Sequence, residues 1–332
     1  MKTDLEAVIQ EVRSAESHLR GPDAESWAAR LDRDHDRIEE ALHWLLKNDP
    51  TSGLELALAL PDYWHLRGKW AEGRDWLERF LAPISAPTPT LRCRALSSIS
   101  GLAFRLGENE KARQFGNEAL EIARSLGDKP LIVGALTRLA RVGLRDNNPR
   151  QTIILCREAL ALAEEAGDEE LSLTPLHCLA EATRMDGDYE GARNLYRRSL
   201  GLNRKRGDEL VIGVETSNLG AVELWFGNVD TAVSLWQESF SLAHRTENRY
   251  LLPYPVAGLG EAAAAKDDWD RAARLLGAAS GLFKASGAAM DPADVAAYEQ
   301  AVARARAGLA DAFARAWSSG ESMTVDEIAA FI

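Results

Sequence analysis

The residues best suited to nucleophilic or metal chemistry are few and scattered along the chain. Cys93, Cys156 and Cys178 show no CxxC spacing, so we expect packed thiols rather than a metal or disulfide site. His177 and Cys178 are adjacent, and on a helix neighbours point about 100° apart, so they cannot form a nucleophile–base pair by themselves.

Sequence motifs for known catalytic sites are missing. The chain contains no HExxH, no GxSxG, no Gly-rich dinucleotide turn and no GxxxxGK[ST] phosphate loop. The RGD at 206–208 occupies a turn that recurs with other residues, so it indicates no adhesion function. We therefore expect a protein that is not an enzyme and that uses no cofactor and no metal.

Composition narrows the classes of partner. A formal net charge of -12 argues against contact with a nucleic-acid backbone or an anionic membrane surface. No apolar run approaches the roughly 20 residues that span a bilayer, and the first residues lack the layout of a signal peptide. With 46% hydrophobic and 27% charged residues, the sequence predicts an ordered protein located in the cytoplasm.

A repeat of forty residues organises most of the chain. Five units align without gaps, and their closing turns LGD, AGD, RGD, TEN and SGA fall at the same place in each unit. The units span 91–130, 131–170, 171–210, 211–250 and 251–290. Because such units pack on their neighbours, 332 residues need not fold around one compact core.

Each unit predicts two helices joined by a tight turn. In the first helix, large aliphatic residues (Ile99, Leu139, Leu179, Leu219, Leu259) precede small ones (Ser100, Ala140, Ala180, Gly220, Gly260). The turn carries residues that tolerate a left-handed conformation: Gly107, Asn147, Gly187, Gly227 and Asp267. In the second helix, a column of residues is predicted to be buried: Phe115, Leu155, Leu195, Leu235 and Leu275. A column of small residues precedes it at Ala112, Thr152, Ala192, Ala232 and Ala272, and another follows it at Ala119, Ala159, Ser199, Ser239 and Ala279.

The flanking segments predict a degenerate unit and caps. Residues 1–50 form N-terminal capping helices, one of them continuous over 24–47, and 51–90 is a degenerate first repeat that Pro61 should bend or split. Residues 291–332 form C-terminal capping helices, the first running to about 318 and the last beginning with a capping box of Thr324 and Glu327.

The period alone also permits HEAT or armadillo repeats, but the pattern of small residues resembles the tetratricopeptide repeat (TPR). We therefore expect an all-α, right-handed superhelical α-solenoid. Segments 18–46, 66–82 and 275–317, including LRGKWAEGRDWLERFLA, resemble the TPR region of bacterial signal-transduction ATPases. These are transcription regulators of the LuxR and Streptomyces antibiotic regulatory types. The phosphate loop and a helix-turn-helix are missing, so we expect either a stand-alone relative or an excised sensor region.

The resemblance implies a binding site on the concave surface, which the first helices of TPR units line. The implied groove residues that we single out are Arg94, Phe104, Arg105, Arg141, Arg145, His177, Glu181, Arg184, Trp225 and Tyr254. Asp62, His65, Thr137, Leu144, Met185, Ser217, Leu224 and Glu261 occupy equivalent positions. Because Arg binds carboxylate and phosphate and aromatic residues dominate interfaces, we expect a protein or peptide partner, acidic in character, or an anionic small effector.

Structural roles explain the same residues without a ligand. Arg105, Arg145 and Arg184 fall in the last turn of a helix, where a cation offsets the macrodipole. Trp225 would cover a turn, and Arg141 would pair with Glu181. The alternative function is a scaffold that self-associates through its convex face or end helices, and the oligomeric state is open.

Overall fold

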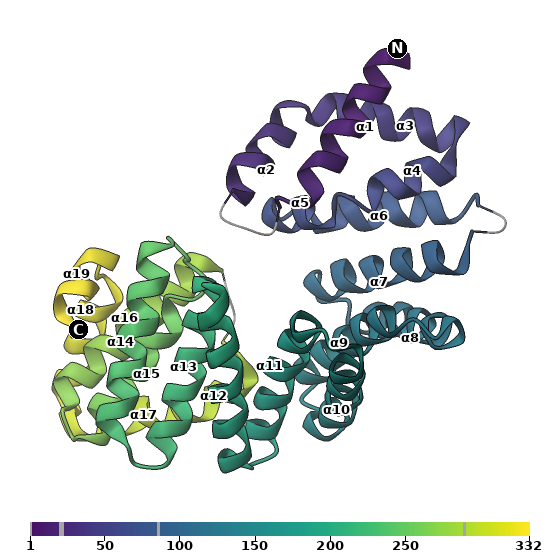
Figure 1. Cartoon of the computed structure of the whole chain (residues 1–332). Helices are drawn as coiled ribbons and strands as arrows, with labels where there is room; N and C mark the ends of the chain where they lie inside the picture. Colours follow the sequence, from purple (N-terminus) through teal and green to yellow (C-terminus); the bar gives the residue numbers. More distant parts are fainter. Residues whose placement is uncertain (1, 20–22, 85–86, 288–289) are drawn as a thin grey trace. The chain divides into compact units, whose positions relative to one another are not determined.

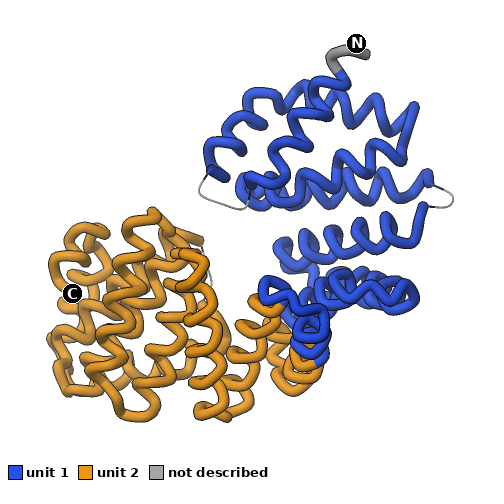
Figure 2. The backbone as a smooth tube through the Cα atoms, in the orientation of Figure 1, with its two compact units in different colours: residues 1–142, 158–171 blue, residues 143–157, 172–332 orange. Residues whose placement is uncertain are grey.

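The computed structural model describes all residues of the chain except 1, 20–22, 85–86 and 288–289. The described residues form α-helices joined by short turns, with one 3₁₀ turn and no strand (Figure 1). They divide into two compact units: unit 1 is Met1–Val142 with Glu158–Leu171, and unit 2 is Gly143–Arg157 with Ser172–Ile332 (Figure 2).

Unit 1 contains α1 (Lys2–Glu16), α2 (Ala24–Arg33), α3 (His35–Asn48), α4 (Pro50–Ala57), α5 (Pro61–Leu66), α6 (Trp70–Leu81), α7 (Pro89–Arg105) and α8 (Asn109–Leu126). Three helices, α9 (Lys129–Arg145), α10 (Pro149–Ala166) and α11 (Glu169–Met185), contribute residues to both units. Unit 2 also contains α12 (Tyr189–Arg206), α13 (Glu209–Trp225), α14 (Val229–Arg245), α15 (Pro253–Ala265), α16 (Trp269–Ser286), α17 (Pro292–Leu309), α18 (Phe313–Glu321) and α19 (Val325–Phe331). Helices that follow each other in sequence pack together as antiparallel hairpins.

The turn inside every hairpin is left-handed, as the repeat predicts. Positive φ values occur at Gly107 (78°), Asn147 (54°), Gly187 (89°), Gly227 (78°) and Asp267 (60°). At the first of these, the Gly107 and Glu108 amides donate to the carbonyls of Phe104 and Ala103, which closes the end of α7. The forty-residue register of the sequence is therefore the register of the hairpins.

The first-helix columns are buried as predicted, but in four of the five units the second-helix column is displaced by one residue. Ile99, Leu139, Leu179, Leu219 and Leu259 are buried, whereas Phe115, Leu155, Leu195 and Leu235 are only half-buried; in the fifth unit Leu275 is buried, as predicted. The buried residues one position later are Gly116, Cys156, Tyr196, Trp236 and Leu276. Together with the small residues at offsets of minus four and plus three, these form one helix face, and the four half-buried residues lie at its flank.

The N-terminal helices differ from the prediction at one point. The expected continuous helix over 24–47 is two helices, α2 and α3, which meet at Asp34. The Asp34 carboxylate accepts a hydrogen bond from the Arg37 side chain in the first turn of α3, and the hydrophobic pattern did not reveal this break. Pro61 splits the degenerate repeat into α4 and α5, as predicted, and it begins α5.

The C-terminal helices also include one break that the sequence did not predict. The helix that begins at Pro292 ends at Leu309, because Ala310 takes a φ of 47° and a 3₁₀ turn leads into α18. The predicted capping box is present: the Thr324 hydroxyl accepts from the Glu327 amide, and the Glu327 carboxylate accepts from the Thr324 amide.

Candidate functional site

The predicted groove residues of unit 1 form a basic surface on α7 and α9. Arg94 is exposed, and Phe104, Arg105 and Arg141 are half-buried. Phe104 packs against a small cluster that includes Val142, so part of its role is structural.

The arginines of this surface lie close enough to His65 to change its titration. Loss of water around the His65 ring lowers its pKa most, and the positive charges of Arg105, Arg141 and Arg138 lower it further. Asp62 acts in the opposite direction. Cationic side chains from two helices, α7 and α9, therefore gather around one imidazole in unit 1.

Most of the predicted residues of unit 2, though not His177 and Glu181, meet at a pocket of about 620 Å³. Its walls come from the ends and inner faces of α11, α13 and α15, and from α17 on the opposite side. Arg184, Trp225 and Tyr254 line it, as do Met185, Ser217, Leu224 and Glu261. Residues of α17 that line it are Pro292, Ala293, Asp294, Ala297, Gln300, Ala301 and Arg304.

Helix α17 runs across the inner face of unit 2, where sequence reasoning placed only a terminal cap. In Figure 1 it passes behind α13 and α15. Its first turn reaches α11 through Asp294, which contacts Arg184 110 residues earlier, and its last turns reach α16, where Arg304 lies over the Trp269 ring. The sequence marks where α17 begins but carries no signal for the surface that it covers.

Arg184 is not an open anion-binding group, in contrast to the prediction. Its side chain is 7% exposed, and its Nη1 donates to Oδ1 of Asp294 over 2.7 Å. Desolvation alone would lower the Arg184 pKa, but the charge of Asp294 raises it. The chain's own carboxylate therefore neutralises this arginine.

His177 and Glu181 lie in a buried polar network beside the pocket. The His177 Nδ1 lies 3.1 Å from Oε1 of Glu215, a carboxylate that is 0% exposed, and its Nε2 lies 3.5 Å from Glu181. The Ser199 hydroxyl also donates to Glu215. Desolvation alone would lower the His177 pKa, but the charges and hydrogen bond of the two carboxylates raise it to about 10. This network therefore links α11, α12 and α13. Neither His177 nor Glu181 lines the pocket.

Trp225 presents the largest accessible aromatic surface at the pocket. Its side chain is 58% exposed and stacks on Tyr189, with ring centroids 4.1 Å apart and planes inclined by 5°. Phe226 meets the edge of the indole at 4.9 Å. The stack covers one face of the Trp225 ring and leaves the rest of its surface accessible to a ligand. Arg145, at the end of α9, is exposed and does not line the pocket.

Glu261, on α15, is a carboxylate of the pocket wall that has no partner. It makes no hydrogen bond and no ion pair with any residue that the structure describes. Desolvation raises the Glu261 pKa most, and the neighbouring charge of Asp294 adds to this, so that the pKa reaches about 8 although Arg184 lowers it. The sequence placed Glu261 on the inner face but not beside a second carboxylate.

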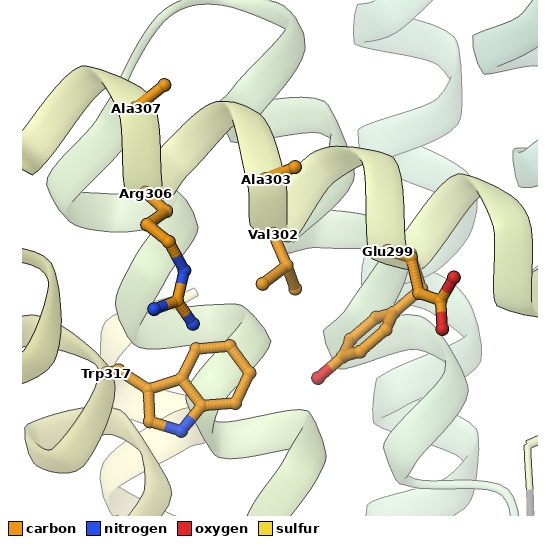
Figure 3. Close-up of a pocket in the computed structure, with 7 residues that line it drawn as sticks. Glu299, Val302, Ala303, Arg306, Ala307 and Trp317 are labelled. Carbon is orange, nitrogen blue, oxygen red and sulfur yellow. The ribbon is translucent and has the colours of Figure 1, made fainter.

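A second hollow lies between α17 and α18. Its volume is about 430 Å³, and it is lined by Tyr298, Glu299, Val302, Ala303, Arg306, Ala307 and Trp317. Figure 3 shows Arg306 extending over this hollow toward Trp317. Nothing in the structure indicates what would cover it.

Three cysteines and one cluster with metal-ligand spacing are found among the described residues. The three cysteines are buried, as the sequence predicts, and a hydrogen bond with Cys178 together with burial raises the Cys156 pKa. Outside the gaps in the description, one cluster has metal-ligand spacing, formed by His35, Glu39 and Glu72. The Lys69 ammonium lies 3.2 Å from the His35 ring nitrogens and 3.7 Å from Glu72, so a cation already occupies that position.

Among the described helices, none combines the length and the apolar character required to cross a bilayer.

Comparison with known proteins places the fold. The chain is similar to the solved structure of a tetratricopeptide repeat protein from Parabacteroides merdae, with a TM-score of 0.56 and 14% identity over 91% of this chain and 99% of that one. It is also similar to a Rap protein complexed with Competence and Sporulation Factor, with a TM-score of 0.62 and 14% identity over 99% and 95% of the two chains.

A third similar structure is NprR in complex with its cognate peptide NprX, with a TM-score of 0.59 and 14% identity over 91% of this chain and 88% of NprR. The chain folds as a TPR-like α-solenoid. No family model matches the sequence, and no curated protein matches it.

Proposed function

We propose that this protein is a non-catalytic module that binds a peptide, or an extended segment of a partner protein, in the pocket of unit 2. The pocket carries this proposal. Its volume of about 620 Å³ lies within the usual range for ligand sites, roughly 300–1,000 Å³. It combines an accessible aromatic ring, Trp225, with polar side chains from four helices, which is the composition expected of a binding site.

The similar structures support a peptide as the ligand. Rap and NprR are TPR-like proteins whose solved complexes contain Competence and Sporulation Factor and the cognate peptide NprX, respectively. The likeness to the regulators named above, in segments 18–46, 66–82 and 275–317, supports a role as the sensor part of a bacterial regulator in the cytoplasm. In unit 1, the basic surface formed by Arg94, Arg105 and Arg141 would take an acidic stretch of a partner.

A peptide-display selection against the full-length chain tests the pocket. Random heptapeptides that wild-type protein retains should bind Trp225→Ala at least tenfold more weakly, because an aromatic side chain at an interface contributes about 2 kcal/mol or more. Trp44→Ala is the matched control, since Trp44 is 39% exposed on α3 of unit 1 and does not line the pocket, so this variant should retain wild-type affinity.

Two outcomes would contradict the proposal. If the selected peptides bind wild type and Trp225→Ala equally, the pocket is not their site. If no peptide is retained, and light scattering shows oligomers that grow with concentration, the scaffold function replaces the binding function.

A further inference from the structure

The charges at the unit 2 pocket do not balance. Of the two arginines that line it, Arg184 is paired with Asp294, and Arg304 lies 3.3 Å from Asp267. Glu261 is left without a cation among the described residues. An ionised carboxylate that has lost water is costly unless a positive charge or hydrogen-bond donors approach it.

The charged groups around Glu261 come from α11 and from the start of α17, and the two whose charges act on it are Asp294 and Arg184. Helix α11 contributes Arg184, together with Glu181 close by. The segment at the start of α17 contributes Asp294, whose charge acts directly on Glu261, and Asp291, which bonds to Tyr254.

The titration of Asp291 shows the same excess of negative charge. Its pKa is raised to about 6 by desolvation first and then by the charges of Glu181 and Asp294. Arg184 is therefore the one arginine whose charge acts on several carboxylates around this pocket, and a further positive charge would stabilise the ionised form of these carboxylates.

Arg184, which contributes to the wall, also holds a buried donor without an acceptor. Its side chain is 7% exposed, and its Nε meets no hydrogen-bond acceptor among the described residues. A buried donor without a partner costs about 1–3 kcal/mol.

From this arrangement we infer that the pocket recognises a cationic group of its ligand, a Lys or Arg side chain or a free amino terminus, which pairs with Glu261 beside Asp294. The neighbouring apolar part of the ligand packs on the exposed face of Trp225. This inference rests on the proposed peptide-binding function and names the ligand's charge. It reverses, for unit 2, the anionic ligand expected from the sequence.

Binding of such a ligand is coupled to a proton. At pH 7 a carboxyl group with a pKa of about 8 is mostly protonated, and a cation placed beside it lowers that pKa. Binding at pH 7 therefore releases a proton from Glu261, and affinity rises with pH until the carboxyl group is fully ionised.

The test repeats the heptapeptide selection with wild type, Glu261→Gln and Glu299→Gln. Glu299 is the matched control, because it is an exposed glutamate of α17 that does not line this pocket. Peptides retained by wild type and by Glu299→Gln should be enriched in Lys and Arg, and those retained by Glu261→Gln should not. For a retained peptide, Lys→Gln should weaken binding to wild type at least tenfold, but binding to Glu261→Gln less than twofold.

Calorimetry in two buffers of different ionisation enthalpy should detect proton release with wild type and not with Glu261→Gln. Retained peptides that depend on Trp225 but are rich in Asp and Glu would overturn the inference and leave the binding function standing. Peptides that depend on Trp225 and show no charge preference would also overturn the inference and leave the binding function standing. Failure to retain any peptide that depends on Trp225 would overturn both the inference and the proposed binding function.

Discussion

The contact between Arg184 and Asp294 predicts an asymmetric response to mutation. Asp294 is the only described partner of the Arg184 guanidinium, which is 7% exposed, whereas the Asp294 side chain is 20% exposed and faces the pocket. Asp294→Ala therefore leaves a buried charge unpaired, which costs about 3–5 kcal/mol. Arg184→Met leaves a carboxylate that water in the pocket can reach, so we expect a smaller loss, about 1–2 kcal/mol.

Native-state hydrogen exchange measures this difference as the free energy of opening of α17, since the contact joins α17 to α11. The amides of α17 should lose more protection in Asp294→Ala than in Arg184→Met, while those of α12 change little. The matched control is Arg245→Ala, which breaks an exposed pair with Glu209 of similar length, 2.7 Å, and should cost below about 1 kcal/mol. Equal losses in the two variants, or a larger loss in Arg184→Met, would refute the argument from unequal burial.

Two further predictions concern the stability of unit 2. Desolvation raises the pKa of Glu223, but two arginines and an asparagine that bond to it lower the pKa more, so its stabilising effect should be present above pH 4.5 and fall away as the pH drops through the folded-state value. Glu223→Gln should cost about 3 kcal/mol at pH 7 and progressively less as the pH falls below 4.5, and urea unfolding at pH 7 and across that acidic range measures this. Gly258→Ala should destabilise by about 1–3 kcal/mol, because a Cβ there would lie 2.1 Å from the Trp236 ring, whereas Gly201→Ala meets nothing within 4 Å and should stabilise by about 0.5–1 kcal/mol.

The repeat architecture could be predicted because it depends on local rules that recur. Gly107 and Asp267 both hold a left-handed turn at the same position of a forty-residue unit, and five coincidences of this kind fix the register. The predicted buried column of the second helix was off by one residue at positions such as Leu195 and Tyr196, where both neighbours are large and apolar. Periodicity alone does not decide which of two such neighbours points inward.

The candidate site was harder to predict because it depends on contacts between distant parts of the chain. Trp225 and Tyr254, which were expected on the inner face from their repeat positions, both line the pocket. The state of Arg184 depends on Asp294, 110 residues away, and no local pattern reports that α17 lies across the inner face. The sequence analysis predicted an anionic ligand from the arginines alone, because the sequence does not reveal their acidic partners.

The position of α17 has a consequence for the kinetics of binding. Because α17 forms one wall of the pocket and is tied to α11 at its first turn, a ligand too large for the existing space enters only when that helix moves aside. For such a ligand the observed association rate would level off as ligand concentration rises, at the rate at which the helix swings away. A ligand that fits the existing pocket would show no such plateau. Stopped-flow measurements would therefore distinguish a ligand that fits the pocket from one that requires α17 to move.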